Sequence, residues 1–136
     1  DPSRVTLEIL ESVGRGGDSF VKEQLMELKS MGLKLAIDDF GVESSNFIRM
    51  FEMEIDYVKI DGSFIRNIDK DEKSYKVVKS VVSFAHSIGA KTIAEFVHSK
   101  EVFDVVRGLG VEYSQGYYIA KPGSDLVYTP LFDLGA

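Results

Sequence analysis

Short apolar segments alternate with longer stretches of helical periodicity along this chain. The short segments are rich in Val, Ile and Leu and are bounded by charged residues or glycine, which is typical of buried strands. They cover Val5–Leu10, Leu33–Ile37, Tyr57–Ile60, Lys91–Ala94 and a fifth strand that opens over Val111–Tyr113.

The stretches between these strands carry apolar residues three and four positions apart, which predicts amphipathic helices. The expected helices run from Asp18 or Ser19 to about Gly32, over a short segment around Phe47–Phe51, through a turn at Phe64 and Ile65, from Ser74 to Ile88 and from Lys100 to Leu109. Alternating strands and helices form parallel sheets through right-handed crossovers. The expected fold class is therefore α/β.

Polar residues stand at or near the end of every predicted strand. They are Glu8, Asp38 with Asp39, Lys59, Glu95 and Gln115. The carboxyl ends of parallel strands meet at one rim, where functional sites gather in such folds. Buried charges cost several kcal/mol unless they are paired or bound to metal, so we expect these side chains to converge. A single acid after a strand more often caps a helix or forms a surface ion pair, and Asp18 and Asp61 are assigned to that role.

Four carboxylates, one lysine and one amide form a set of hard ligands, and the chain contains no cysteine. Such a set suits Mg²⁺ or Mn²⁺ rather than structural zinc. Adjacent acids such as Asp38 and Asp39 can bridge two metal ions about 3.5–4 Å apart, an arrangement that serves in-line phosphoryl displacement. Lys59 would hold the attacking water or neutralise charge on the phosphate.

The amino-acid composition excludes several classes of function and partner. The 136 residues carry 16 Lys and Arg against 22 Asp and Glu, a formal charge of −6. That balance argues against a DNA or RNA partner and against a polybasic membrane contact. The absence of cysteine excludes a disulfide scaffold and a thiol nucleophile. No glycine-rich Walker loop is present, so nothing supports an NTPase.

Five motifs in order resemble the EAL family of bacterial cyclic di-GMP phosphodiesterases. They are LEILES (Leu7–Ser12), LAIDDFG (Leu35–Gly41), DYVKID (Asp56–Asp61), IAEFV (Ile93–Val97) and QGYYIAKP (Gln115–Pro122). The resemblance covers residues 1–122 and leaves 123–136 as a tail or short helix. It implies a TIM-like (β/α)8 barrel, a two-metal site, cleavage of cyclic di-GMP to linear pGpG, and a cytoplasmic location.

The resemblance also implies roles for individual residues. Glu8, Asp38, Asp39 and Glu95 resemble the family's metal ligands, with Lys59 as the lysine that orients the attacking water and Gln115 as the glutamine near it. Glu11 is similar to the glutamate that anchors the loop after the Asp pair. His98 stands where the family usually has a second Glu and is assigned to support the ligands. Pro122 and Tyr117 are expected to contact the nucleotide.

Other features depart from the family pattern. The EAL tripeptide, its Glu, the following Arg and an Asn ligand are absent from the sequence, and the loop over Val42–Ser44 is altered. An eight-stranded α/β barrel typically needs about 250 residues, so we expect the C-terminal part of a barrel, with about five βα units, from a longer parent chain. The parent is expected to be the enzyme and the isolated fragment inactive.

Two alternatives stay open beside the enzyme. A degenerate domain would sense cyclic di-GMP or a protein partner without turnover, and a purely structural domain would serve dimerisation. A partial barrel exposes strand edges and apolar faces. Self-association, as a homodimer or otherwise, is therefore expected for this chain.

Overall fold

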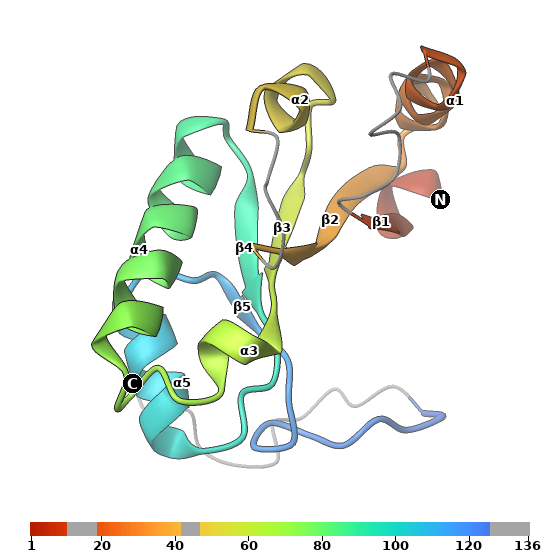
Figure 1. The fold of residues 1–136 in the computed structure, drawn as a ribbon. Helices are drawn as coiled ribbons and strands as arrows, with labels where there is room; N and C mark the ends of the chain where they lie inside the picture. The colour runs from red at the N-terminus through yellow and green to blue at the C-terminus, as the bar shows by residue number, and fades with distance from the viewer. Residues whose placement is uncertain (11–18, 42–46, 126–136) are drawn as a thin grey trace.

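The computed structural model describes residues 1–10, 19–41 and 47–125, and within these it contains a five-stranded parallel sheet (Figure 1). The strands lie in sequence order and are β1 (Thr6–Leu10), β2 (Lys34–Phe40), β3 (Tyr57–Ile60), β4 (Lys91–Ala94) and β5 (Tyr113–Ser114). Every neighbouring pair is parallel. The prediction of an α/β fold with parallel strands is confirmed.

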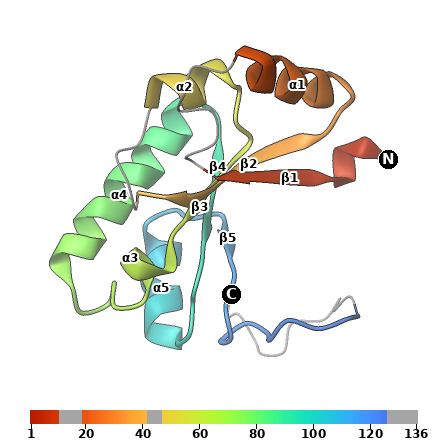
Figure 2. The ribbon, with the colours of Figure 1, turned by 45° about the vertical axis from the view of Figure 1, so that its right-hand side comes forward.

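The connections between strands carry the helices. They are α1 (Ser19–Ser30), α2 (Phe47–Glu52), α3 (Gly62–Ile65), α4 (Glu72–Ser87) and α5 (Lys100–Gly108), with a 3-10 turn over Pro2–Arg4. Helix α4 contacts β3, β4 and α3. In both ribbon views α1 lies at the β1–β2 end of the molecule, away from α4 (Figure 2). Within the described ranges, no helix has the length and apolarity needed to cross a membrane.

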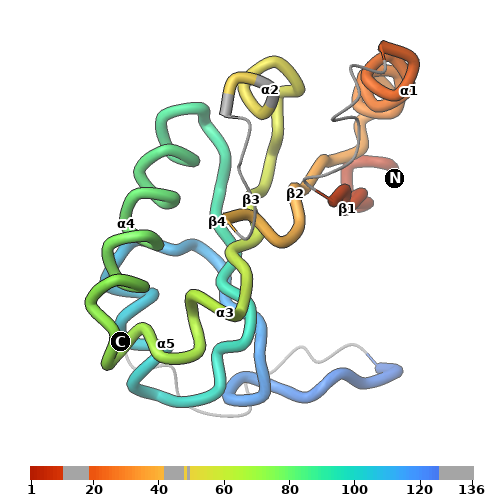
Figure 3. The backbone as a smooth tube through the Cα atoms, viewed as in Figure 1, coloured from red at the N-terminus to blue at the C-terminus, as the bar shows by residue number. Residues whose placement is uncertain are grey.

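The core sits between α4, α5 and the central strands, and the tube trace shows these segments close together (Figure 3). Val58 and Ile60 of β3 are fully buried, as are Val78 of α4 and Val102 of α5. Burial declines toward β1, which alternates between exposed and half-buried residues. Strand β3 is apolar apart from Tyr57 and Lys59, as expected of an inner parallel strand, whereas β1 is less buried and, among the described strands, pairs only with β2.

Several element boundaries differ from the sequence prediction. Strand β2 continues past Ile37 to Phe40, and α1 ends at Ser30. Two further differences have local reasons. Helix α4 begins before Ser74 because the Asp71 carboxylate accepts hydrogen bonds from the amides of Lys73 and Ser74, each at 3.2 Å, and caps the helix earlier. Strand β5 begins at Tyr113 rather than Val111 because the amide of Val111 still donates to the carbonyl of Val106, at 3.2 Å. Strands β3 and β4 have the predicted bounds.

Candidate functional site

The ammonium group of Lys59 lies at the centre of the predicted cluster. Its side chain is 6% exposed, and Nζ lies 3.0 Å from Glu8 Oε2, 3.2 Å from Asp38 Oδ1 and 3.2 Å from Glu95 Oε1. These carboxylates belong to β1, β2 and the segment that directly follows β4. Residues far apart in the sequence thus meet at one point because parallel strands end at the same rim.

Strand alternation explains why a lysine is tolerated in a buried strand. Val58 and Ile60 flank Lys59, and both are fully buried. Because successive side chains of a strand point to opposite faces, Lys59 points away from the face that these two residues bury. The parallel pairing is prolonged past β4, where the Glu95 amide donates to the Ile60 carbonyl at 3.2 Å. This extra bond fixes Glu95 beside Lys59.

An irregularity in β2 brings the second acid of the Asp pair to the same place. The pairing of β2 with β3 shifts register between Ile37 and Phe40, and Asp39 has a φ of 56°. In a regular strand, consecutive side chains diverge, whereas a bulge re-aims one of them. Carboxylate oxygens of Asp38, Asp39 and Glu95 consequently lie within 4.8 Å of one another.

The electrostatics of this group favour an added cation. Burial raises the pKa of Asp39, and the neighbouring carboxylates of Asp38 and Asp61 raise it further. Burial also raises the pKa of Glu95, which its hydrogen bond to Lys59 offsets only in part. Burial alone would lower the pKa of Lys59, but its hydrogen bonds to Glu8 and Glu95 outweigh this effect and raise it. One ammonium therefore faces several carboxylates, and the cluster keeps an excess of negative charge.

The donor set fits a hard divalent cation. Three carboxylates of Asp38, Asp39 and Glu95 can each offer an oxygen to the same ion, and oxygen ligands are those that Mg²⁺, Ca²⁺ and Mn²⁺ prefer. Glu8 stands outside that group of three, and its carboxylate instead binds Lys59. The structure thus places Glu8 as a partner of the lysine, beside the group of three carboxylates.

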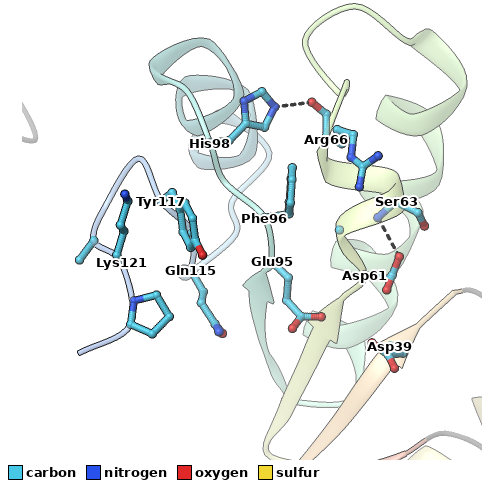
Figure 4. A pocket seen from close by; sticks show the side chains of 14 residues that line it. Asp39, Asp61, Ser63, Arg66, Glu95, Phe96, His98, Gln115, Tyr117 and Lys121 are labelled. Atoms are coloured by element: carbon cyan, nitrogen blue, oxygen red, sulfur yellow. Dashed lines mark hydrogen bonds between the residues drawn. The ribbon is translucent and has the colours of Figure 1, made fainter. Parts of the chain in front are cut away.

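A pocket of about 880 Å³ opens beside the carboxylates (Figure 4). Asp39 and Glu95 line it, and so do three of the residues that the sequence assigned to substrate or water: Gln115, Tyr117 and Pro122. The backbone N–H of Gln115 donates to the carbonyl of Ala94 at 2.8 Å, and the backbone carbonyl of Gln115 accepts from the Val97 N–H at 3.0 Å. This backbone pairing fixes the C-terminal wall of the pocket against β4.

Gly116 is required in that wall by a close approach of two backbones. A Cβ built on Gly116 would lie 2.2 Å from the carbonyl oxygen of Val97, a distance no side chain tolerates. Only glycine allows the segment around Gln115 to approach β4 this closely. The glycine of the QGYY motif is therefore required by the packing of the backbone.

His98 also lines the pocket, but its imidazole is turned away from the carboxylates. Its Nε2 lies 2.7 Å from the carbonyl oxygen of Arg66, and its ring packs edge-on against Phe96. In the structure, His98 ties the segment after β4 to the residues after α3. Glu11, the predicted loop anchor, and the altered loop over Val42–Ser44 lie outside the described residues.

Sequence reasoning gave no role to four further charged, polar or aromatic residues of the pocket: Ser63, Arg66, Phe96 and Lys121. Asp61 was assigned to a helix cap, and it does cap α3 by accepting from the Ser63 amide at 2.7 Å. The same carboxylate lines the pocket and influences the pKa of Asp39. In the sequence, only the position of Asp61 and Gly62 directly after a strand indicated that this segment lines the pocket.

Known proteins with a similar sequence and fold identify the family of this chain. A sequence model described as the EAL domain matches residues 1–122. The chain belongs to the EAL domain family. Its five strands are the C-terminal part of the TIM-like barrel of that family, as predicted. The EAL structure "EAL Enzyme Bd1971", bound to cAMP and cyclic di-GMP, has a TM-score of 0.84 and 34% identity over 89% of this chain and 32% of its own.

Curated EAL relatives are named as enzymes. Cyclic di-GMP phosphodiesterase PdeB of Shewanella oneidensis is 35% identical over 95% of this chain and 15% of its own length. Cyclic di-GMP phosphodiesterase PdeF of Escherichia coli is 35% identical over 88% of this chain and 16% of its own length. BlrP1 of Klebsiella pneumoniae, solved with calcium and cyclic di-GMP, has a TM-score of 0.81 at 30% identity, over 89% of this chain and 31% of its own. The chain thus spans less than a fifth of these two curated relatives.

Proposed function

We propose that this EAL chain provides part of the active site of a phosphodiesterase that opens cyclic di-GMP to linear pGpG. The observation that carries the proposal is the contact of the buried Lys59 ammonium with carboxylates from β1, β2 and the segment that directly follows β4. Two curated relatives are named as enzymes of this activity, and EAL structures have been solved with cyclic di-GMP. An acidic cluster beside a pocket of nucleotide size is the expected form of such a site.

In this proposal Asp38, Asp39 and Glu95 hold divalent ions, for which Mg²⁺ and Mn²⁺ are the candidates. Support comes from the mutual approach of their oxygens and from BlrP1, which was solved with calcium and with manganese. Such ions supply Lewis acidity and neutralise charge on a phosphodiester. The excess of carboxylates over ammonium groups becomes useful in this setting, because it holds cations where an anionic substrate must bind.

Lys59 has two tasks in the proposed reaction. Its ammonium stays protonated, because carboxylate partners raise its pKa. It therefore cannot act as a base at neutral pH and serves as a hydrogen-bond donor. Its three N–H groups face Glu8, Asp38 and Glu95 and hold them in place, and one of them would turn from its carboxylate to the attacking water or the phosphate. Gln115 would orient the same water with its amide, and Tyr117 and Pro122 would contact the nucleotide.

The activity assay uses the natural full-length protein, with Mg²⁺ or Mn²⁺ and cyclic di-GMP, and pGpG is quantified by chromatography. We expect pGpG to form, and chelation of the metal to abolish its formation. Cyclic di-AMP serves as the control for base specificity. Failure to produce pGpG with either metal, by a protein that is folded by circular dichroism, would refute the enzymatic proposal.

A second function is proposed for the 136-residue chain taken alone: ligand binding without turnover. The described part of the chain brings only three carboxylates within mutual ligand distance, and two hard ions need more oxygen donors than three side chains supply. We expect no pGpG from this chain, with cyclic di-GMP binding still measurable by calorimetry in Ca²⁺. Turnover above a metal-free blank would overturn this assignment.

Self-association is proposed on separate grounds. Val5, just before β1, and Leu10, the last residue of β1, are each 51% exposed, and among the described strands β1 pairs only with β2. An unpaired strand edge with apolar neighbours is a template for a second chain. Light scattering of the 136-residue chain is expected to give a mass of at least a dimer, and a monodisperse monomer would exclude it. The cytoplasm is the proposed location, in keeping with a second-messenger substrate.

A further inference from the structure

Phe96, which directly follows Glu95, has an unusual conformation for a large residue. Its φ is 63°, in the left-handed region, and its side chain is among the exposed large hydrophobics, at 48%. Left-handed backbone is unfavourable for a bulky L-residue and persists only where the surrounding structure imposes it, most often at binding sites. The next residue, Val97, is fully buried, so the core at this point is filled by Val97 and does not need the ring of Phe96.

The neighbours of Phe96 hold its ring in one position. The guanidinium carbon of Arg66 lies 4.8 Å from the ring centroid, and the His98 ring lies edge-on at 5.6 Å. Arg66 is itself tied to His98 through its carbonyl oxygen. On the other side of the contact, a Cβ on Gly62 would lie 2.8 Å from Phe96 Cβ. The glycine thus makes room for a ring that Arg66 and His98 then fix.

The ring faces the pocket that contains the carboxylates. Phe96 and Tyr117 both line it, and Tyr117 is 68% exposed with Lys121 Nζ 5.7 Å from its ring centroid. In Figure 4 the ring of Phe96 is seen edge-on, between Arg66 and Tyr117. One pocket therefore presents two exposed aromatic rings, each with a cation nearby. This combination suits a planar base carried on an anionic backbone, since bases stack on aromatic rings and phosphates pair with cations.

We propose that the ring of Phe96 is a stacking platform for a purine base of the nucleotide, and that Arg66 supports the ring and neutralises the adjacent phosphate. This inference rests on the proposed function, because that function supplies the cyclic dinucleotide. It goes further by assigning a binding role to Phe96, a residue of the IAEFV motif to which the sequence gave no role. The energetic cost of the left-handed backbone is then offset by ligand binding.

The first test is a Phe96→Gly substitution in the natural full-length protein. Glycine accepts the left-handed backbone, so folding is expected to be retained or improved while the platform is lost. KM for cyclic di-GMP should rise about tenfold, the effect of losing one base–aromatic stack, while kcat changes less than threefold. Phe96→Tyr keeps the ring and should retain the wild-type KM.

A matched control separates backbone relief from the loss of the ring. Glu54 also has a left-handed φ, 51°, and is exposed outside this pocket, so Glu54→Gly should leave KM unchanged. An unchanged KM in Phe96→Gly would overturn the platform. So would a fall in kcat and melting temperature together, because that pattern would mark a structural role.

A second measurement keeps the inference testable if the enzymatic proposal fails. Guanosine monophosphate is titrated into the same protein, and the ring resonances of Phe96 are followed by NMR. Upfield shifts in the wild type, with weaker binding in Phe96→Gly, would support stacking even if no pGpG is ever formed. Absence of any shift at millimolar nucleotide would overturn the platform, whatever the outcome of the hydrolysis assay.

Discussion

Two charged clusters at opposite ends of the sheet show how differently one fold can treat buried charge. At the carboxyl ends of the strands, one ammonium, Lys59, faces three carboxylates. At the amino ends the arrangement is reversed, because one carboxylate, Asp56, faces two lysines. Asp56 lies 2.7 Å from Lys29 Nζ and 3.8 Å from Lys34 Nζ, and it also accepts from the Leu35 amide at 2.9 Å.

The difference lies in charge balance. Asp56 is matched by two cations and a backbone donor, so its negative charge is fully compensated and its cluster contributes to stability. Lys59 is outnumbered, so its cluster retains negative charge that a metal ion can satisfy. In α/β barrels the carboxyl ends of the strands serve function and the amino ends serve stability. The two clusters predict that substitutions at one end alter activity, whereas substitutions at the other alter the free energy of unfolding.

The largest effect is expected for Lys59→Met in the natural full-length protein. The substitution removes the donor that fixes three carboxylates and is proposed to face the attacking water. Loss of one well-placed donor typically lowers kcat by about 10²–10³-fold, and we expect a decrease in this range for pGpG formation. Lys34→Met, at the opposite end, is the control and should keep wild-type kcat. A Lys59→Met enzyme within threefold of wild type would remove Lys59 from the proposed mechanism.

Asp56→Asn should produce the opposite pattern. It weakens the contact with Lys29 and the hydrogen bond from the fully buried Leu35. We expect a loss of about 2 kcal/mol in the free energy of unfolding, measured by urea denaturation, with kcat per folded molecule unchanged. The Lys34→Met variant should cost less than about 0.5 kcal/mol, because that lysine is partly exposed and more distant. Equal losses in both variants would show that neither the Lys29 contact nor the Leu35 hydrogen bond contributes to stability.

A second stabilising carboxylate at the amino end makes the comparison sensitive to pH. Glu112 accepts from the amide and the hydroxyl of buried Thr92, each at 2.7 Å, and contacts His86. Burial alone would raise the pKa of Glu112, but these hydrogen bonds outweigh burial and lower it below 4.5. A carboxylate with a depressed pKa contributes stability above its unfolded pKa, and this contribution disappears as the pH falls through the folded pKa.

Glu112→Gln should therefore cost about 1 kcal/mol at neutral pH, the difference between a charged and a neutral hydrogen-bond acceptor. The cost should shrink as the pH is lowered from about 5.5 toward about 3, because protonation of the wild-type carboxyl then begins to remove its charge. Urea denaturation across this interval measures it, with exposed Glu101→Gln as the control. A cost that stays constant over the interval would contradict the assigned charge effect.

Much of the carboxyl-end cluster could be predicted because it depends on strand order alone. Glu8, Asp38, Lys59 and Glu95 converge as soon as their strands are parallel and adjacent. The approach of Asp39 was expected from the adjacent acids, but its cause, a register shift with a left-handed residue, is not visible in the sequence. The pairing of Phe96 with Arg66 was missed for the same reason, because it follows from a backbone conformation that phenylalanine rarely adopts.

The smallest effect on stability, and one of opposite sign, is expected for Asp39→Asn. The pKa of Asp39 is raised by burial and by its acidic neighbours, so the folded state disfavours its negative charge at neutral pH. Asparagine removes that charge and tolerates a left-handed backbone, so the free energy of unfolding should increase by a few tenths of a kcal/mol. Exposed Asp125→Asn should leave the free energy of unfolding unchanged.

The same Asp39→Asn protein should lose the rise in melting temperature that Mn²⁺ confers on the wild type, because a ligand has been removed. A variant that is more stable without metal and insensitive to added metal would show that this end of the sheet forgoes stability to hold cations. A variant destabilised without metal would place Asp39 with Asp56, among the carboxylates that hold the fold together.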